Sequence, residues 1–144
     1  MITPDEIKRE TGKLPFGTGR FAKSIEALAE LSTPTESLLA TCIGLNPTFK
    51  HTSVTLAGGL MELTKATNVL LAATTERLVV LSTGFSGGTR EADDVAYDGL
   101  EVVSASKKDL TLRWPDAEMT VKGCLKPMLP GLVDAINAQA RPAS

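Results

Sequence analysis

The feature that most constrains the fold is a run of short apolar segments, rich in Val, Leu and Thr, between residues 37 and 122. Gly, Asp and Lys turn signals separate the segments, which is typical of β-strands. In one segment Leu110, Leu112 and Trp114 alternate with Thr111 and Arg113, so one face of that strand is apolar. The pattern predicts strands near Leu38–Leu45, Val54–Leu63, Val69–Thr74, Leu78–Thr83, Thr89–Val95, Leu100–Ala105, Leu110–Trp114 and Glu118–Lys122. Val54–Leu63 contains two adjacent glycines, and its final residues also fit a helix.

The clearest helical patterns lie at the two ends of the chain, although residues 69–82 also contain helix-favouring Ala, Leu and Glu, and their Val and Thr content favours a hairpin. Thr3-Pro4-Asp5-Glu6 is a helix-capping pattern and predicts a short first helix. A second helix is predicted from Arg20 to Leu31, where four apolar side chains form one stripe: Phe21, Ile25, Leu28 and Leu31. Thr33-Pro34-Thr35-Glu36 repeats the capping pattern and predicts a further helical turn. A terminal amphipathic helix is predicted from Leu125, Met128, Leu129, Leu132, Val133 and Ile136.

These elements predict a chain that is mainly β with flanking helices (α+β). Residues 1–35 form an N-terminal helical extension, and residues 36–140 form a strand-rich domain that ends in the terminal helix. A length of 144 residues is enough for one self-sufficient hydrophobic core.

Composition argues against several classes of function. With 15 Lys and Arg against 17 Asp and Glu, and with 4% aromatic residues, the chain lacks the basic and stacking surface that nucleic acid requires. One His and two Cys do not supply a closed zinc site, so no metal or other cofactor is expected. Cys42 and Cys124 are interpreted as reduced core thiols. No apolar run is long enough to span a bilayer and no secretory signal is evident, so we expect a cytoplasmic protein that is not transmembrane.

The same inventory of side chains argues against an enzyme. His51 is the only imidazole, and it pairs with Cys42 as base and nucleophile only if the fold happens to bring them together. An exposed loop histidine is the preferred interpretation. The acidic residues around Asp93-Asp94 match no calcium-loop spacing. We therefore expect a noncatalytic protein.

Two motifs in the strand region resemble a known family. Thr74 and Arg77 match a Thr-x-x-Arg-Leu turn after an apolar strand, and Tyr97-Asp98 begins a Tyr-Asp-x-Ile-like stretch before the next strand. Together with the terminal helix, they resemble a bacterial pleckstrin-homology (PH)-like domain of the YokE-like group. The resemblance covers roughly residues 36–140. It implies a strongly bent β-barrel or sandwich of about seven strands that the C-terminal helix caps at one end.

The resemblance implies a binding module, and two sets of residues are candidates. Relatives that bind phosphorylated lipids use a basic cup; its Lys-x-Arg pattern is absent here, but five basic residues can meet at one mouth of the barrel as a ligand site: Arg77, Arg90, Lys107, Lys108 and Arg113. Solvated strand ends and hairpin tips explain the same residues without a ligand. Four apolar residues are candidates for contact with a partner: Phe21, Ile25, Leu28 and Phe85. Packing of the Phe21–Leu28 stripe within the chain is the alternative.

The functional prediction is a noncatalytic PH-like module that binds a protein partner or forms a homo-oligomer, through its loops or an exposed strand edge. One alternative is binding to an anionic phospholipid headgroup at a membrane surface. A second alternative is a structural role in a bacterial or phage assembly, because the family that the chain resembles includes prophage-encoded members.

Overall fold

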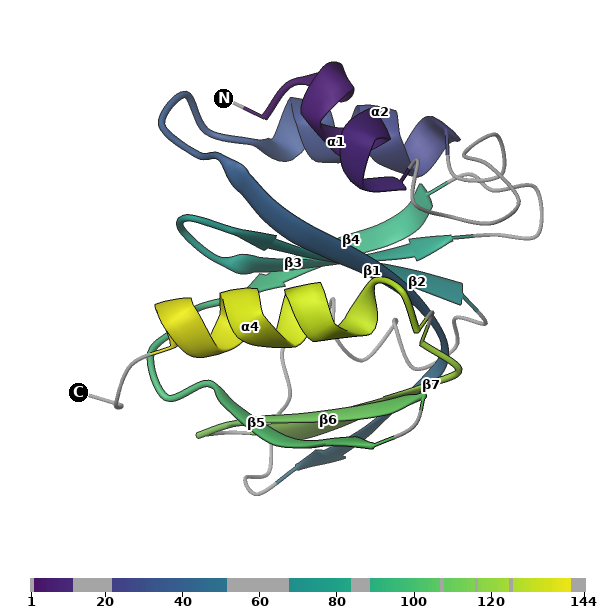
Figure 1. The fold of residues 1–144 in the computed structure, drawn as a ribbon, viewed down its shortest axis with the longest axis vertical. Helices are drawn as coiled ribbons and strands as arrows, with labels where there is room; N and C mark the ends of the chain where they lie inside the picture. The colour runs from purple at the N-terminus through teal and green to yellow at the C-terminus, as the bar shows by residue number, and fades with distance from the viewer. Residues whose placement is uncertain are drawn as a thin grey trace.

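The computed structural model describes residues 2–11, 22–51, 68–83, 89–106, 108–115, 117–124 and 126–140. Within these residues the chain forms three helices and seven strands (Figure 1). The helices are α1 (Pro4–Thr11), α2 (Ala22–Leu31) and α4 (Leu129–Gln139). The strands are β1 (Leu38–His51), β2 (Asn68–Thr74), β3 (Leu78–Thr83), β4 (Thr89–Val95), β5 (Glu101–Ser106), β6 (Asp109–Trp114) and β7 (Ala117–Lys122). The predicted class, mainly β with flanking helices, is confirmed. The strand predicted at Val54–Leu63 lies outside the described residues.

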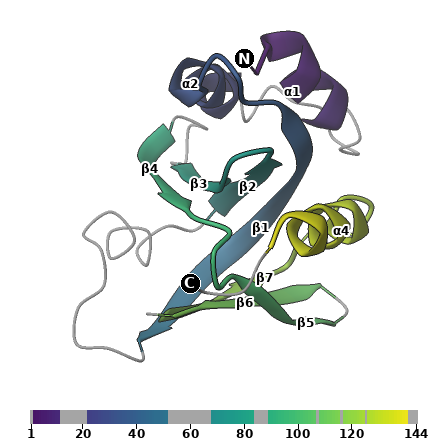
Figure 2. The same ribbon diagram turned by 90° about the vertical axis from the view of Figure 1, so that its left-hand side faces the viewer.

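All seven strands belong to one antiparallel sheet with the order β4-β3-β2-β1-β7-β6-β5. This order is a line and not a ring, so β4 and β5 are the two edges, and no pairing joins them in the part of the chain that the structure describes. The strands described here therefore do not close into a barrel, which is one of the two forms that the resemblance implies. The sheet is bent instead, and α4 lies between its two halves (Figure 1 and Figure 2).

The bend follows from β1, which is 14 residues long and belongs to both halves of the sheet. Its first half, Leu38 to Leu45, pairs with β2, and its second half, Leu45 to His51, pairs with β7. The register with β7 shifts between Leu45 and Thr48, and Pro47, which has no amide hydrogen, falls within that bulge. The prediction ended this strand at Leu45 and placed His51 in a loop. Both were wrong, because the strand continues against a partner that lies far along the chain.

A glycine allows the two halves of the sheet to approach each other at the bend. A Cβ atom on Gly44 would lie 2.2 Å from Cγ1 of Val121 and 3.3 Å from Sγ of Cys124. Both neighbours are buried, so neither has free space to move into. Gly44 is therefore required by close packing and not by an unusual backbone angle.

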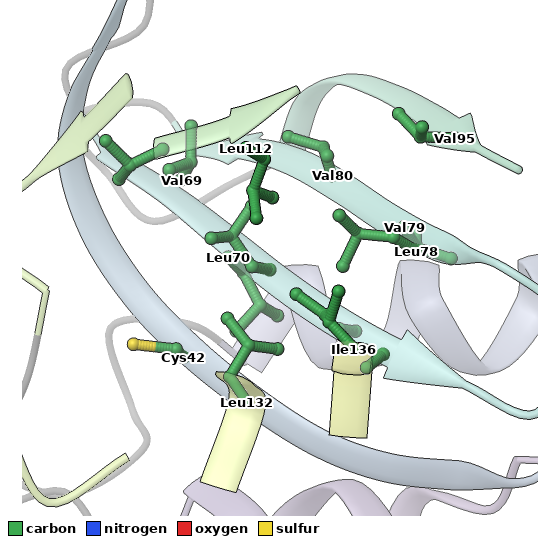
Figure 3. Packing of buried hydrophobic residues seen from close by; sticks show 14 of the residues in the cluster. Cys42, Val69, Leu70, Leu78, Val79, Val80, Val95, Leu112, Leu132 and Ile136 are labelled. Atoms are coloured by element: carbon green, nitrogen blue, oxygen red, sulfur yellow. The ribbon is translucent and has the colours of Figure 1, made fainter. Parts of the chain in front are cut away.

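The core lies between the inner face of the bent sheet and α4. The predicted alternation is confirmed, because Leu110, Leu112 and Trp114 of β6 are buried between more exposed neighbours. Leu132 and Ile136 of α4 are fully buried and project toward the face of β2 that carries Leu70 (Figure 3). The terminal helix thus supplies the apolar side chains that cover the opening of the sheet.

The N-terminal helices pack within the same chain on the half of the sheet that contains β3 and β4. Helix α1 contacts α2 and β1, and α2 also contacts β3 and β4. Ile2, which precedes α1, Ile7 of α1 and Leu28 of α2 are at most 1% exposed and belong to the same core as the strands. Thr3 caps α1 as predicted, because its hydroxyl accepts the backbone N–H of Glu6 at 3.2 Å.

Candidate functional site

The turn between β2 and β3 is organised by one threonine. The hydroxyl of Thr74 accepts the backbone N–H groups of Glu76 at 3.1 Å and Arg77 at 3.0 Å. The backbone N–H of Thr74 donates to the carbonyl of Arg77 at 2.9 Å. Short hydroxyl side chains stabilise tight turns in this way. The Thr-x-x-Arg spacing therefore has a local structural reason.

A fully buried carboxylate, that of Glu36, lies against this turn. It accepts hydrogen bonds from the Thr74 hydroxyl at 2.5 Å and from Nε and Nη2 of Arg77 at 3.0 and 3.2 Å. The backbone N–H of Thr33 donates a further bond at 3.1 Å. Burial alone raises the pKa of Glu36, but the hydrogen bonds from Arg77, Thr74 and Thr33 outweigh burial and hold the pKa below its ordinary value.

This carboxylate also explains why the helical turn predicted at Thr33–Glu36 is absent. The backbone N–H of Glu36 donates to the carbonyl of Thr33 at 3.2 Å, so a turn forms. The chain then extends directly into β1 instead of continuing as a helix. The side chain of Glu36 reaches back to Thr33 as in a capping box, but the same carboxylate is also bound by Arg77.

The guanidinium of Arg77 connects this turn to three other elements. Nη1 donates to Asp94 of β4 at 2.8 Å, and Nη2 donates to the carbonyl of Leu31 at the end of α2 at 2.6 Å. The hydrogen bond to Glu36 raises the pKa of Arg77, which stays charged. We call Glu36, Thr74, Arg77, Asp94 and Tyr97 the arginine latch.

Tyr97 completes the latch from the segment that follows β4. Its hydroxyl lies 2.6 Å from the carbonyl oxygen of Thr74 and 2.9 Å from that of Arg77, so one phenol donates to both ends of the turn. Burial raises the pKa of Tyr97 to about 12. The two sequence motifs that carry the resemblance therefore converge on one structural network that joins α2, β1, the β2–β3 turn and β4.

The structure describes three of the five predicted ligand side chains, those of Arg77, Lys108 and Arg113, and these three lie at different places. Arg77 belongs to the latch at the start of β1, and Arg113 pairs with Glu118 across β6 and β7 at 3.4 Å. Lys108 lies at the opposite end of β6 from Arg113, where its carbonyl accepts the backbone N–H of Cys124 at 2.7 Å. Arg90 is in β4, but its side chain, like the whole of Lys107, is outside the described residues.

The predicted partner residues give a similar result. Leu28 is buried in the core of its own chain, which is the alternative that the sequence left open. Ile25 lies in α2, but its side chain is outside the described residues, as are Phe21 and Phe85. We therefore look for an interaction surface elsewhere, among residues that the structure leaves exposed.

Strand β5 is the most exposed strand for which every side chain is described. Five of its six residues are exposed, and it pairs with β6 on one side only in the part of the chain described here. Its register with β6 shifts between Val102 and Ser104, which leaves Val103 as a bulge residue that is 40% exposed. An unpaired edge of this kind offers backbone N–H and C=O groups to another strand.

A hollow of about 460 Å³ lies between β5 and α4. It is lined by Ala105, Lys126, Leu129, Pro130, Val133 and Asp134. Ala105 pairs with Leu110, which is fully buried, so Ala105 faces the inner side of the sheet and yet remains exposed. An apolar hollow therefore remains between α4 and this corner of the sheet, because the residue on the edge strand is small.

A second, polar hollow of about 790 Å³ lies on the outer face of the same hairpin. Four hydroxyl residues line it, namely Ser104, Ser106, Thr111 and Thr120. Lys108, Asp109 and Lys126 also line it. Lys126 lines both hollows, so they adjoin at this side chain. We call β5, the two hollows and the first turn of α4 the β5 surface.

Sequence reasoning identified Lys108 in this region and missed Lys126 and Ala105. The signal for Ala105 is a small residue at the end of a strand whose partners are large, but the bulge at Val103 changes which residues face inward. Lys126 precedes the terminal helix, which was predicted from its apolar residues alone.

The remaining chemistry of the described residues is limited. No group of three or more His, Cys, Asp or Glu side chains within the described ranges is arranged to hold a metal ion. Cys42 and Cys124 are both free and buried, and a hydrogen bond with Cys42 lowers the pKa of Cys124. None of the helices that the structure describes has the length and apolar character needed to cross a bilayer. Comparison with family models, curated proteins and solved structures finds no match for this chain.

Proposed function

We propose that this chain is a noncatalytic, PH-like interaction module that binds an extended segment of a protein partner along β5. The observation that carries the proposal is the exposed edge of β5, which pairs with no strand other than β6 among the described residues, beside the exposed, inward-facing Ala105. A partner segment that adds to this edge forms backbone hydrogen bonds with β5 and places alternate side chains toward the hollow.

The PH-like part of the proposal rests on topology and on the latch. Seven antiparallel strands are followed by a helix that packs into the bend of the sheet, as in the family that the sequence resembles. Thr74, Arg77 and Tyr97, which carry that resemblance, are in contact with one another. The open sheet has a functional consequence in this interpretation, because it leaves β5 free to accept another strand.

The composition of β5 favours a different protein segment over a second copy of this chain. Four of its six residues are Glu, Ser or Ala. A second β5 would therefore bring mostly small or polar side chains against a hollow that Leu129, Pro130 and Val133 make largely apolar. A segment with a larger apolar side chain at that position buries more surface and gains about 25 cal/mol for each Å² of apolar area removed from water.

A peptide library displayed on phage tests the proposal. We expect the purified chain to enrich nonapeptides with alternating apolar residues, and the selected peptides to bind in fluorescence anisotropy. Ala105→Trp fills the apolar hollow and should weaken binding by tenfold or more, a change of about 1.4 kcal/mol. Ala96→Trp is the matched control, since Ala96 is exposed and lies after β4, at the other edge of the sheet.

Two results would contradict the proposal. One is the absence of any enriched peptide whose binding depends on Ala105. The other is a chain that sediments as a dimer and becomes monomeric on the Ala105→Trp change, because the occupant of the β5 edge is then a second copy.

A further inference from the structure

We infer that the β5 surface selects partner segments that carry an acidic side chain, bound in the polar hollow between Lys108 and Lys126. This inference rests on the proposed function, and it adds the chemistry of the partner to it.

The charges that line the polar hollow support an acidic side chain in the partner. Arg77 and Arg113 are each paired with a carboxylate, but neither Lys108 nor Lys126 has an ion-pair partner among the residues that the structure describes. Both lysines are exposed and line the polar hollow, where Asp109 is the one acidic residue among the described residues of the lining. The two ammonium groups therefore leave the hollow with a net positive charge.

The hydroxyl groups of the hollow suit a carboxylate as well. Ser104 and Ser106 are exposed on β5, and their hydroxyls can donate hydrogen bonds to an oxyanion. The hydroxyls of Thr111 and Thr120 lie 3.1 Å apart and hydrogen-bond to each other. The hollow thus combines two cations with further donors, and charge-assisted hydrogen bonds are stronger than neutral ones.

The register of the β5–β6 hairpin predicts the spacing, within the partner segment, between its apolar anchor and its acidic residue. Ala105 faces the inner side with Leu110, whereas Ser104 and Thr111 form the next pair and face the outer side. Successive side chains of an added strand point to opposite faces as well. The acidic residue should therefore lie one or three positions from the apolar anchor and not two.

A peptide fits these charges better than a lipid surface does. Asp109, Asp134 and Glu101 lie on or beside the β5 surface and reduce its attraction to a continuous anionic membrane. A carboxylate on a segment that is already paired with β5 meets the lysines at a high effective concentration. Individual exposed ion pairs are weak, so we expect a roughly three- to tenfold preference for acidic over basic peptides.

Library selection on charge-reversed variants tests this inference. The unmodified chain should enrich Asp or Glu at an odd spacing from the apolar anchor. The double variant Lys108→Glu/Lys126→Glu should enrich Lys or Arg at that position instead, and each single variant should lose part of the acidic preference. Arg9→Glu is the matched control for a single reversal, because Arg9 is exposed on α1. Thermal unfolding of each variant verifies that it is folded.

The outcomes separate the inference from the proposed function. Two results would overturn the inference and leave the proposed function intact. In the first, the selected peptides depend on Ala105 but show no acidic preference. In the second, the acidic preference survives the double charge reversal. A third result would overturn both in favour of a lipid headgroup. In that case no selected peptide depends on Ala105, the chain binds vesicles of equal parts phosphatidylserine and phosphatidylcholine, and the double charge reversal abolishes that binding. Reversal of the selected charge supports both.

Discussion

Removing the guanidinium of the arginine latch should destabilise the fold severely. In Arg77→Met the aliphatic part of the side chain is kept, but the fully buried carboxylate of Glu36 loses its ion pair and two hydrogen bonds. A buried charge without its partner typically costs about 3 to 5 kcal/mol. Because Arg77 is 23% exposed and water can partly replace it, we expect about 3 kcal/mol. For a chain of this size that corresponds to a fall in Tm of roughly 10 °C.

A double-mutant cycle isolates the ion pair from other effects of the substitution. Glu36→Gln/Arg77→Met removes both charges and keeps an amide whose oxygen can accept the backbone N–H of Thr33, with its NH2 group facing the Thr74 hydroxyl. We expect the double variant to recover about 2 kcal/mol relative to the additive sum of the single changes. Urea unfolding followed by the fluorescence of Trp114, the only tryptophan and a buried one, measures each free energy.

The pH dependence supplies the decisive comparison. The pKa of Glu36 is lowered in the folded chain, so its carboxylate stabilises the fold above the unfolded pKa of about 4.3. That stabilisation is lost as the pH falls through the lower folded pKa. In Arg77→Met a neutral Glu36 is tolerated better than a charged one, so the difference from the unmodified chain should shrink in acid. A loss below about 1 kcal/mol at neutral pH, or a difference that does not change with pH, would refute the role assigned to the carboxylate.

Further variants test the tyrosine of the latch and the close packing at the bend of the sheet. Tyr97→Phe should cost about 1 to 2 kcal/mol at neutral pH, because the carbonyls of Thr74 and Arg77 lose their shared donor. Since burial raises the pKa of Tyr97 to about 12, its protonated phenol stabilises the fold fully below the unfolded value of about 10, and this contribution is lost as the pH rises from 10 to 12. The variant should therefore show a flatter alkaline limb in urea unfolding, and tyrosinate absorbance titrating near pH 10 in the folded chain would contradict the assignment. Gly44→Ala should cost about 1 to 3 kcal/mol through the clash with Val121, whereas Gly131→Ala, with no atom within 4 Å of the added Cβ, should be neutral or stabilising. Equal unfolding midpoints for these two glycine variants would remove the packing argument.

The strands were predictable because their signal is local. Alternation at Leu110, Leu112 and Trp114 reflects burial of one face of a strand, and the bounds of β2, β3 and β4 agree with the prediction within one residue. The extent of β1 was not predictable in this way, because its second half depends on pairing with β7. The sequence also did not predict that the described sheet is open, because this depends on whether the edge strands β4 and β5 pair with each other.

The interaction surface was less predictable than the fold. Arg77 was interpreted as a ligand residue because it was expected to share one mouth of the barrel with other basic residues, and only the position of Glu36 in space explains its internal role. The exposure of Ala105 depends on an irregularity of register that no periodic pattern reports. Lys126 becomes relevant only when the helix is placed next to the hairpin. Each of these facts concerns residues distant in sequence.

The long β1 strand has a consequence for the order in which this chain can fold during synthesis. The first half of β1 can pair with β2 as soon as β2 leaves the ribosome, and β3 and β4 can then add to the sheet. The second half must wait for β7, which comes after every other strand in the sequence. Pairing across so much chain carries a loop-closure cost that slows folding. The half-sheet that holds β5 should therefore be the last to assemble.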